Sequence, residues 1–171
     1  QEICDSLAKK PSVVMICITC VDALLGTDME RICRKSEEKT GLPVRPCYMY
    51  ALTREGRKPP MVHVRQSLYS LLEPKKKKGN VVNLLGFFSP LMDDCELYGM
   101  LEKAGVKTVH EISRCKNYEE YQTMSEANFN LVLHPEARFA AEDFHDRLKI
   151  PYIELRRLYQ IDKIASQYRA F

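Results

Sequence analysis

The strongest constraint on the fold is an apolar segment with no polar alternation, residues 12–19 (SVVMICIT). Its mostly apolar, partly β-branched side chains are typical of a strand that is covered on both faces. Residues 81–88 (VVNLLGFF) form a second such segment. Strands of this kind occur in parallel sheets, whose crossover connections are usually helices. The two segments therefore predict an α/β fold with Rossmann-like parallel sheets flanked by helices.

The first half of the chain also carries helix signals. Residues 27–30 (TDME) have the Thr-x-x-Glu form of a capping box and open an amphipathic pattern. We expect this helix to end near Lys39, because Gly41 can cap its C-terminus and a proline follows. A strand, a loop and a second helix are then predicted over residues 44–50, 53–60 and 61–73.

A lysine-rich segment separates the two halves of the chain. Residues 74–80 (PKKKKGN) place four like charges between a helix breaker and a glycine. We expect this segment to stay solvated and to mark a domain boundary. The prediction is a part of a first α/β domain over residues 1–78 and a second Rossmann-like domain over residues 79–171.

The second half alternates strand and helix patterns. Strands are predicted over 81–88, 107–112, 130–133 and 151–155, and helices over 91–104, from 117, 135–149 and 161–168. This order implies right-handed βαβ crossovers and one parallel sheet. Asp93 and Asp94 are expected in the first turn of the helix over 91–104, where the helix dipole favours acids. No Gly-x-Gly-x-x-Gly motif follows a strand, so a dinucleotide site has no local support.

Composition excludes several function classes. No apolar run approaches the roughly 18 residues of a membrane span, and the net charge of +3 is too small to indicate a nucleic-acid partner. The first residues lack the pattern of an export signal, so we expect a cytoplasmic protein. Residues 54–78 hold eight Lys or Arg against two Glu, a local charge of +6. This segment is either a solvated linker and helix face or a docking patch for an acidic partner.

Cysteine usage points away from a disulfide framework. The chain has seven Cys, an odd number, and most are expected to be reduced. Cys33 and Cys95 fall within helical patterns and are predicted to be buried apolar side chains. Cys17 and Cys20 at the end of the first strand have the spacing of metal ligands or of a redox pair. On an extended strand they face opposite sides, which favours incidental cysteines.

His134 is the other candidate, because it ends a predicted strand immediately before a helix. A histidine there can bind a metal, contact an anion together with the helix N-terminus, or cap the strand end. No His-x-x-x-His or Glu-x-x-His pattern supplies partners for it. No Ser-His-Asp or Cys-His arrangement can be assembled elsewhere.

Several segments resemble the nitrogenase component 1 family, which includes the nitrogenase molybdenum-iron protein and protochlorophyllide reductase-like subunits. Residues 18–29 (ITCVDALLGTDM) are similar to the family's strand, cysteine, turn and helix, and residues 41–44 (GLPV) to its next strand entry. The second half resembles the family's second Rossmann-like domain at residues 81–86, 96–106, 126–132 and 150–154. The resemblance covers nearly the whole chain but only part of a family member's length.

The resemblance implies an oxidoreductase subunit, or part of one, that transfers electrons through an iron-sulfur cluster to a reducible substrate. It implies two partners, a second component 1-like subunit and an ATP-dependent iron-sulfur reductase. In the family, the cysteine that matches Cys20 ligates an iron-sulfur cluster at the interface between two subunits. Cys17 has no counterpart in that role. The isolated chain is expected to be inactive.

The chain departs from the family pattern at several positions, including residues 47–52 (CYMYAL), which replace the Gly-Phe element usual after the second strand. Thr27 stands where the family has the first acid of a Gly-Asp-Asp turn, and residues 133–134 (LH) stand where molybdenum-iron enzymes place a cofactor-binding cysteine. We therefore do not expect dinitrogen reduction, and His134 is a candidate ligand for a different metal centre or a tetrapyrrole. Two alternatives stay open: a non-catalytic Rossmann-like module that binds a small anionic ligand or a protein partner, and a Cys17–Cys20 dithiol redox pair.

Overall fold

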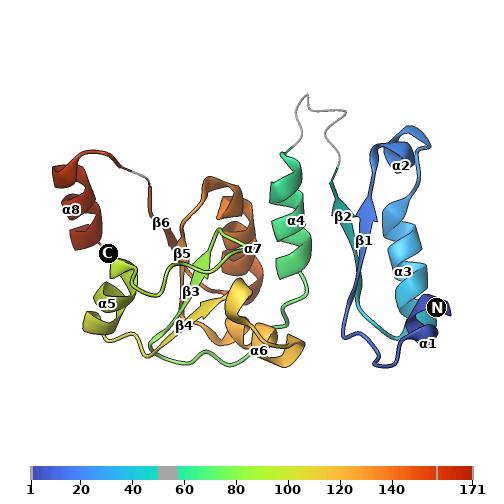
Figure 1. The fold of residues 1–171 in the computed structure, drawn as a ribbon, viewed down its shortest axis with the longest axis horizontal. Coiled ribbons are helices and arrows are strands. Elements are labelled where there is room, and N and C mark those ends of the chain that lie inside the picture. The colour runs from blue at the N-terminus through green and yellow to red at the C-terminus, as the bar shows by residue number, and fades with distance from the viewer. Residues whose placement is uncertain (1, 50–57, 157, 171) are drawn as a thin grey trace. The chain divides into compact units, whose positions relative to one another are not determined.

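The computed structural model describes residues 2–49, 58–156 and 158–170, which form two compact units, Gln1–Leu71 and Leu72–Phe171. Each unit holds a parallel sheet with helices beside it, which confirms the predicted fold class (Figure 1). Within the described ranges, no helix has both the length and the apolar character needed to span a membrane.

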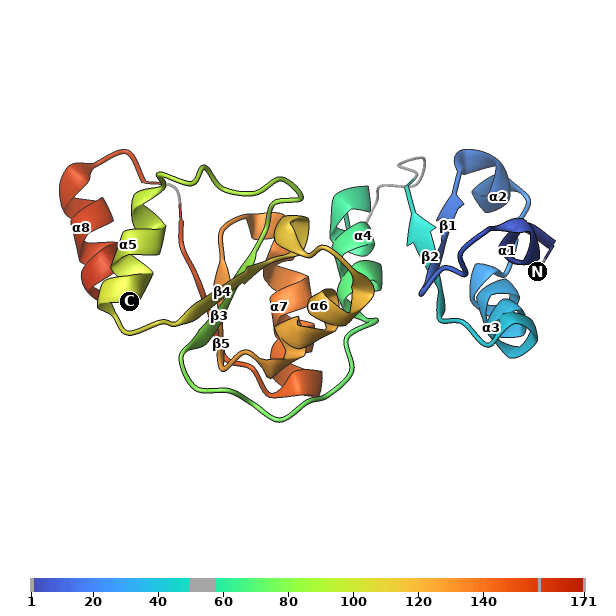
Figure 2. The same cartoon turned by 60° about the horizontal axis from the view of Figure 1, so that its bottom comes forward.

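The first unit contains a two-stranded sheet. The strands β1 (Val14–Ile18) and β2 (Val44–Tyr48) pair in parallel, with Val14 opposite Val44 and Ile18 opposite Tyr48. The helices of this unit are α1 (Glu2–Ser6), α2 (Cys20–Leu24), α3 (Met29–Thr40) and α4 (Pro60–Tyr69). In Figures 1 and 2, α3 and α4 lie on opposite sides of the two strands.

The helix α3 differs from its prediction at the start and agrees with it at the end. Its N-cap is Asp28, whose side chain accepts a hydrogen bond from the Arg31 backbone N–H at 3.0 Å. The expected cap, Thr27, lies one residue before it. At the other end Gly41 adopts φ +66°, a left-handed conformation that glycine adopts without strain.

The second unit contains a four-stranded parallel sheet in the order β4-β3-β5-β6. Its strands are β3 (Val81–Leu85), β4 (Thr108–Glu111), β5 (Phe129–Val132) and β6 (Tyr152–Glu154). Its helices are α5 (Glu96–Lys103), α6 (Tyr118–Gln122), α7 (Arg138–Leu148) and α8 (Ile161–Ala170), with 3-10 turns at Ile112–Arg114, Thr123–Glu126 and Pro135–Ala137. Figure 2 shows α5 and α8 on one side of this sheet and α6 and α7 on the other.

Apolar side chains cover both faces of this sheet, as the sequence predicted for β3. Leu84 and Leu131 pack with Leu97 and Leu101 of α5 on one face. The other face carries a polar pair: Asn83, which is fully buried, donates through Nδ2 to Asn130 Oδ1 at 2.7 Å and to the Met124 carbonyl at 2.9 Å. These bonds satisfy Asn83 Nδ2 and Asn130 Oδ1, whereas Asn83 Oδ1 and Asn130 Nδ2 are buried without a hydrogen-bond partner.

The lysine-rich segment is solvent-exposed as predicted, except at the half-buried Lys77, and the boundary between the two compact units lies just before it, between Leu71 and Leu72. The segment belongs to the second unit, where Lys77 Nζ donates to the Ser125 carbonyl at 2.6 Å and the Lys78 backbone N–H donates to the Glu126 carbonyl at 2.8 Å. Partial burial lowers the pKa of Lys77. Long lysine stems can pack on a surface while the ammonium finds a carbonyl, which the charge count alone did not predict.

The basic segment is also less continuous than its charge count suggests. Arg65 is only 5% exposed, and its guanidinium donates to the Met61 carbonyl inside α4 at 2.9 Å. Arg54 and Arg57 lie outside the described residues, as do most of the loop predicted over 53–60 and the last residue of the strand predicted over 44–50.

Candidate functional site

Cys20 is the first residue of α2 and follows the carboxyl end of β1 by two positions. Thr19, between them, caps the helix. The Asp22 carboxylate accepts hydrogen bonds from the Thr19 backbone N–H at 3.0 Å and from its hydroxyl at 3.1 Å. These bonds hold the turn that carries the thiol. Sequence periodicity missed α2 because a helix of five residues is too short to show it.

The surface around Cys20 is apolar and open. The Cys20 thiol is exposed, and so are the side chains of Val21 (62%), Leu24 (79%) and Leu25 (75%). Large apolar side chains grouped at a surface commonly mark a contact with another protein surface. The Cys20 thiol is therefore accessible to a ligand or a protein that is not part of the first unit.

Cys17 has a different neighbour from the one its spacing suggested. It lies in β1 directly opposite Cys47 of β2, and burial together with the neighbouring Cys17 raises the pKa of the Cys47 thiol. Cys17 is exposed, whereas Cys47 is 5% exposed. Of the two cysteines predicted in helices, Cys33 is buried as expected, while Cys95 precedes α5 as its N-cap and is only partly buried.

His134 follows β5 and caps the turn Pro135–Ala137. Its Nδ1 accepts a hydrogen bond from the Glu136 backbone N–H at 3.3 Å, which is the strand-end role among the three that we considered. The ring packs edge-on against Phe87, with 5.7 Å between ring centroids. Phe87 follows β3, so the residues after two neighbouring strands meet at the carboxyl edge of the sheet, where ligands of open α/β folds gather.

Gly86 makes this meeting possible. Its φ is +150°, and a Cβ at this position would lie 2.8 Å from the His134 backbone nitrogen. Only glycine permits both the conformation and the close approach. Sequence reasoning included Gly86 in a similar segment without recognising this role. A glycine at the end of an apolar strand is the signal that could have revealed it.

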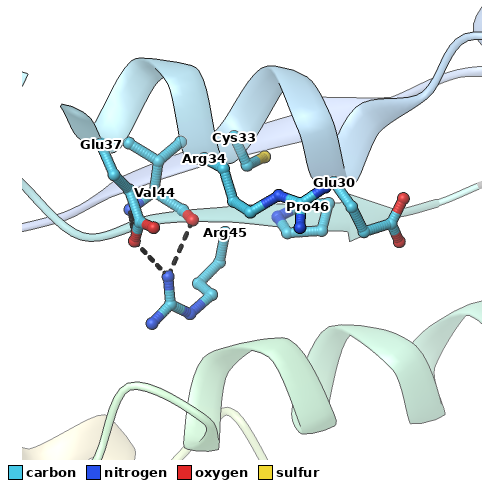
Figure 3. Close-up of a pocket in the computed structure, with 7 residues that line it drawn as sticks. All are labelled: Glu30, Cys33, Arg34, Glu37, Val44, Arg45 and Pro46. Carbon is cyan, nitrogen blue, oxygen red and sulfur yellow. Dashed lines mark hydrogen bonds and ion pairs between the residues drawn. The ribbon is translucent and has the colours of Figure 1, made fainter. Parts of the chain in front are cut away.

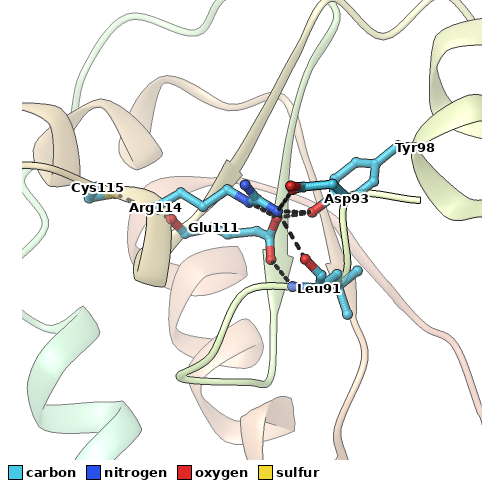
Figure 4. A network of polar contacts seen from close by, with 6 residues as sticks. All are labelled: Leu91, Asp93, Tyr98, Glu111, Arg114 and Cys115. Carbon is cyan, nitrogen blue, oxygen red and sulfur yellow. Dashed lines mark hydrogen bonds and ion pairs between the residues drawn. The ribbon is translucent and has the colours of Figure 1, made fainter. Parts of the chain in front are cut away.

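A cluster of charged and polar side chains closes the carboxyl end of β4 (Figure 4). Glu111 is only 6% exposed and accepts hydrogen bonds from the Leu91 backbone N–H at 2.9 Å, from Arg114 Nε at 3.0 Å and from the Tyr98 hydroxyl. Arg114 Nη2 also donates to the Leu91 carbonyl at 2.9 Å and to Asp93 Oδ1 at 2.6 Å. Burial and the bond to Glu111 raise the pKa of Tyr98.

This cluster fixes the segment before α5 rather than offering a reactive group. Each charge in it already has an opposite charge or a hydrogen-bond partner within the cluster. The prediction that Asp93 lies in the first turn of a helix is wrong. The helix α5 begins at Glu96, and Asp93 precedes it and pairs with Arg114. Sequence reasoning missed Glu111 and Arg114, because pairing between segments about twenty residues apart leaves no local pattern.

An open pocket between α3 and β2 is lined by Glu30, Cys33, Arg34, Glu37, Val44, Arg45 and Pro46 (Figure 3). Two of its charged groups, Glu37 and Arg45, are paired with each other. Glu37 accepts hydrogen bonds from the Val44 backbone N–H at 2.9 Å and from the Arg45 guanidinium, and these lower its pKa. Burial raises the pKa of the Cys33 thiol, which keeps it protonated and unreactive.

No metal site is complete within the described residues. Among residues 2–49, 58–156 and 158–170, no three His, Cys, Asp or Glu side chains are grouped so that they could hold a metal ion. Cys20 and His134 lie in different units and are each single candidates. A group bound at either residue would need ligands from elsewhere.

Comparison with known proteins gives one consistent result. Three similar proteins are called nitrogenase iron-molybdenum cofactor biosynthesis protein NifE. That of Nostoc sp. is 27% identical over 156 residues, 89% of this chain and 32% of the relative. That of Rhizobium meliloti is 27% identical over 86% of this chain and 32% of the relative, and that of Clostridium pasteurianum 24% identical over 86% and 33%.

Solved structures show the same fold. The structure "Nitrogenase Cp1 at pH 6.5" matches 93% of this chain and 31% of its own, with a TM-score of 0.65 and 21% identity. The chain thus spans about a third of the length of the relatives that it matches. The model of the family described as Nitrogenase component 1 type Oxidoreductase matches residues 2–171, so the chain belongs to this family.

Proposed function

We propose that this chain is the part of a component 1-type subunit that supplies one thiolate, Cys20, to an iron-sulfur cluster shared with a second subunit. The observation that carries the proposal is the exposed Cys20 thiol after the carboxyl end of β1, beside the exposed side chains of Val21, Leu24 and Leu25. Thiolates are the ligands that iron-sulfur clusters require.

The residues around Cys20 are suited to supply one of the ligands of such a cluster. The Asp22–Thr19 hydrogen bonds hold the turn that positions the thiol. Val21, Leu24 and Leu25 would exclude water from the contact when a second subunit covers them, and a low-dielectric shell tunes the potential of a cluster. When bound, the cluster would store and pass on electrons. Its remaining ligands would come from the partner subunit or from parts of the subunit outside this chain.

Two functions are compatible with this placement. The names of the curated relatives favour a subunit on which a metal cofactor is assembled. The family description instead favours an oxidoreductase. As the resemblance implies, such a subunit would receive electrons from an ATP-dependent iron-sulfur reductase and pass them to a substrate. We place cofactor assembly first, because the similar proteins of Nostoc sp., Rhizobium meliloti and Clostridium pasteurianum share that name.

His134 is proposed to contact a second bound group, distinct from the cluster at Cys20, as a hydrogen-bond donor. Because Nδ1 accepts a backbone N–H, the neutral ring carries its proton on Nε2. That nitrogen then lacks the lone pair a metal requires, but it can donate to an anionic or sulfide-rich group. Direct ligation of a second metal centre or a tetrapyrrole would require the ring to give up its bond to Glu136.

Iron and sulfide analysis of the full-length subunit tests the Cys20 proposal. The protein is co-purified anaerobically with its partner subunit as wild type, Cys20→Ser and Cys17→Ser. We expect Cys20→Ser to lose most of the iron and sulfide, and Cys17→Ser, another exposed cysteine of the same unit, to retain both. Full iron and sulfide in Cys20→Ser would overturn the proposal.

A transfer assay separates the two functions. The metal-loaded subunit is incubated either with a cofactor-free acceptor protein or with an electron donor and reducible substrates. Cofactor assembly predicts stoichiometric transfer of metal to the acceptor without turnover. Repeated substrate reduction with the metal retained would instead establish the oxidoreductase.

A further inference from the structure

We propose that Cys17 and Cys47 form a redox-active dithiol, which closes to a disulfide between β1 and β2 when a low-molecular-weight disulfide is the oxidant. The proposal concerns a pair of thiols that the cluster proposal does not use. It also replaces the Cys17–Cys20 pair suggested by the sequence spacing with a pair defined by strand register.

The geometry of the sheet brings the two cysteines together. They are register partners in a parallel ladder, Cys17 opposite Cys47. Register partners direct their side chains to the same face of the sheet. Neighbouring strands lie about 4.7–4.9 Å apart, within the range of about 4.4–6.8 Å that a disulfide spans between Cα atoms. Because Cys17 and Cys47 are register partners, only the side-chain torsions and a small approach of the strands separate the two thiols from a bond.

The two thiols differ in access, which sets the order of the reaction. Cys17 is exposed and can meet a small disulfide, whereas Cys47 is 5% exposed. Burial, followed by the neighbouring Cys17, raises the pKa of Cys47 and keeps it as a thiol until a sulfur is delivered beside it.

The electrons balance over two exchange steps. The Cys17 thiolate attacks a sulfur of the small disulfide, forms a mixed disulfide and releases one small thiol. Cys47, deprotonated as it reacts, attacks the Cys17 sulfur and releases the second small thiol. Two protein thiols are oxidised to one disulfide, and one small disulfide is reduced to two thiols.

The crosslink is expected to be reversible rather than structural. The two Cβ atoms of a disulfide lie about 3.8 Å apart. The Cβ atoms of register partners in a parallel pair are separated by the distance between strands, about 4.7–4.9 Å, so closing the bond draws β1 and β2 together. Strained disulfides are the more easily reduced ones. Excess small thiol should therefore restore both free cysteines.

Mass mapping of the 171-residue chain tests this inference. The reduced chain is equilibrated with mixtures of oxidised and reduced glutathione, its remaining thiols are alkylated, and it is digested with trypsin without reduction. We expect a crosslink between the peptides of residues 10–31 and 40–54, at a mass about 2 Da below their sum, as two hydrogens are lost in the exchange. Both peptides follow from the Lys and Arg positions.

Three variants identify the sulfur involved, because the peptide of residues 10–31 carries both Cys17 and Cys20. Cys17→Ser and Cys47→Ala should abolish the crosslink, and Cys20→Ser should retain it. Cys17→Ser is an exposed substitution that leaves the core intact, and circular dichroism confirms folding of each variant. A crosslink that survives Cys17→Ser, or glutathione attached to Cys17 without any crosslink, would overturn the inference.

Failure here and failure of the cluster proposal are distinguishable. Cys20→Ser is expected to lose iron and keep the crosslink, and Cys17→Ser to lose the crosslink and keep iron. Each variant thus serves as the matched control for the other.

Discussion

Replacement of Glu111 by Gln should destabilise the second unit, because this buried carboxylate accepts hydrogen bonds from three donors. The donors are the Leu91 N–H, the Tyr98 hydroxyl and Arg114 Nε. A glutamine carbonyl can still accept at one oxygen position, but its NH2 group would face a donor at the other. The substitution therefore breaks at least one hydrogen bond and leaves a donor unpaired in a site where Glu111 is 6% exposed.

The expected loss follows from these contacts. An unpaired buried donor costs about 1–3 kcal/mol. The Arg114 side chain is 42% exposed and keeps Asp93 as a partner, so the lost ion pair adds little. We predict that Glu111→Gln lowers the free energy of unfolding by about 2 kcal/mol. Glu102→Gln, an exposed acid of α5, should change it by less than about 0.5 kcal/mol.

Urea denaturation and amide hydrogen exchange measure the two levels of this effect. The denaturation midpoint reports the global loss, and the Leu91 amide reports the segment that Glu111 holds. We expect faster Leu91 exchange in Glu111→Gln only. Equal midpoints for the two variants together with unchanged Leu91 exchange would show that the cluster does not hold the segment before α5.

Three further predictions concern other parts of the fold. Gly86→Ala should lower the free energy of unfolding by about 2 kcal/mol or more, because its Cβ would lie 2.8 Å from a backbone nitrogen and φ is +150°. Gly99→Ala lies in open space on α5 and should raise the free energy of unfolding by up to about 1 kcal/mol. Thermal melting of both variants checks the opposite signs. Glu37→Gln should cost about 1 kcal/mol at neutral pH. The lowered pKa of Glu37 means that its contribution is present above the unfolded pKa and is lost as pH falls through the folded pKa, so wild type and variant should converge in acid when their unfolding is compared across pH. Burial lowers the pKa of His110 below its ordinary 6.5, so the unfolded chain binds more protons than the folded chain on acidification. The contribution of His110 to stability should be complete above pH 6.5 and should be lost as pH falls through the folded pKa. His110→Gln should flatten this part of the plot of unfolding free energy against pH.

The strands and long helices were predictable because their signals are local. An apolar run such as residues 81–85 needs only its own side chains to indicate a covered strand, and the structure places all five of them in the core. Capping signals were less decisive. Thr27 and Asp28 are both good N-cap residues, and the side chain that reaches the Arg31 N–H determines which one caps α3.

The site residues were only partly predictable. Cys20 and His134 stood out because they follow strands, and the structure places both after carboxyl ends of parallel strands. The partner of Cys17 was not predictable from spacing, since it depends on the register of β1 against β2. Glu111 and Gly86 act through segments distant in sequence, so their roles emerge only when the chain is folded.

Selenium X-ray absorption tests the central claim most directly. Selenocysteine replaces Cys20 in the full-length subunit, which is assembled anaerobically with its partner subunit and loaded with iron and sulfide. The account predicts iron in the first shell of selenium beside its carbon. A selenium atom bonded to carbon alone, in protein that retains its full iron content, would contradict the role of Cys20 as a cluster ligand.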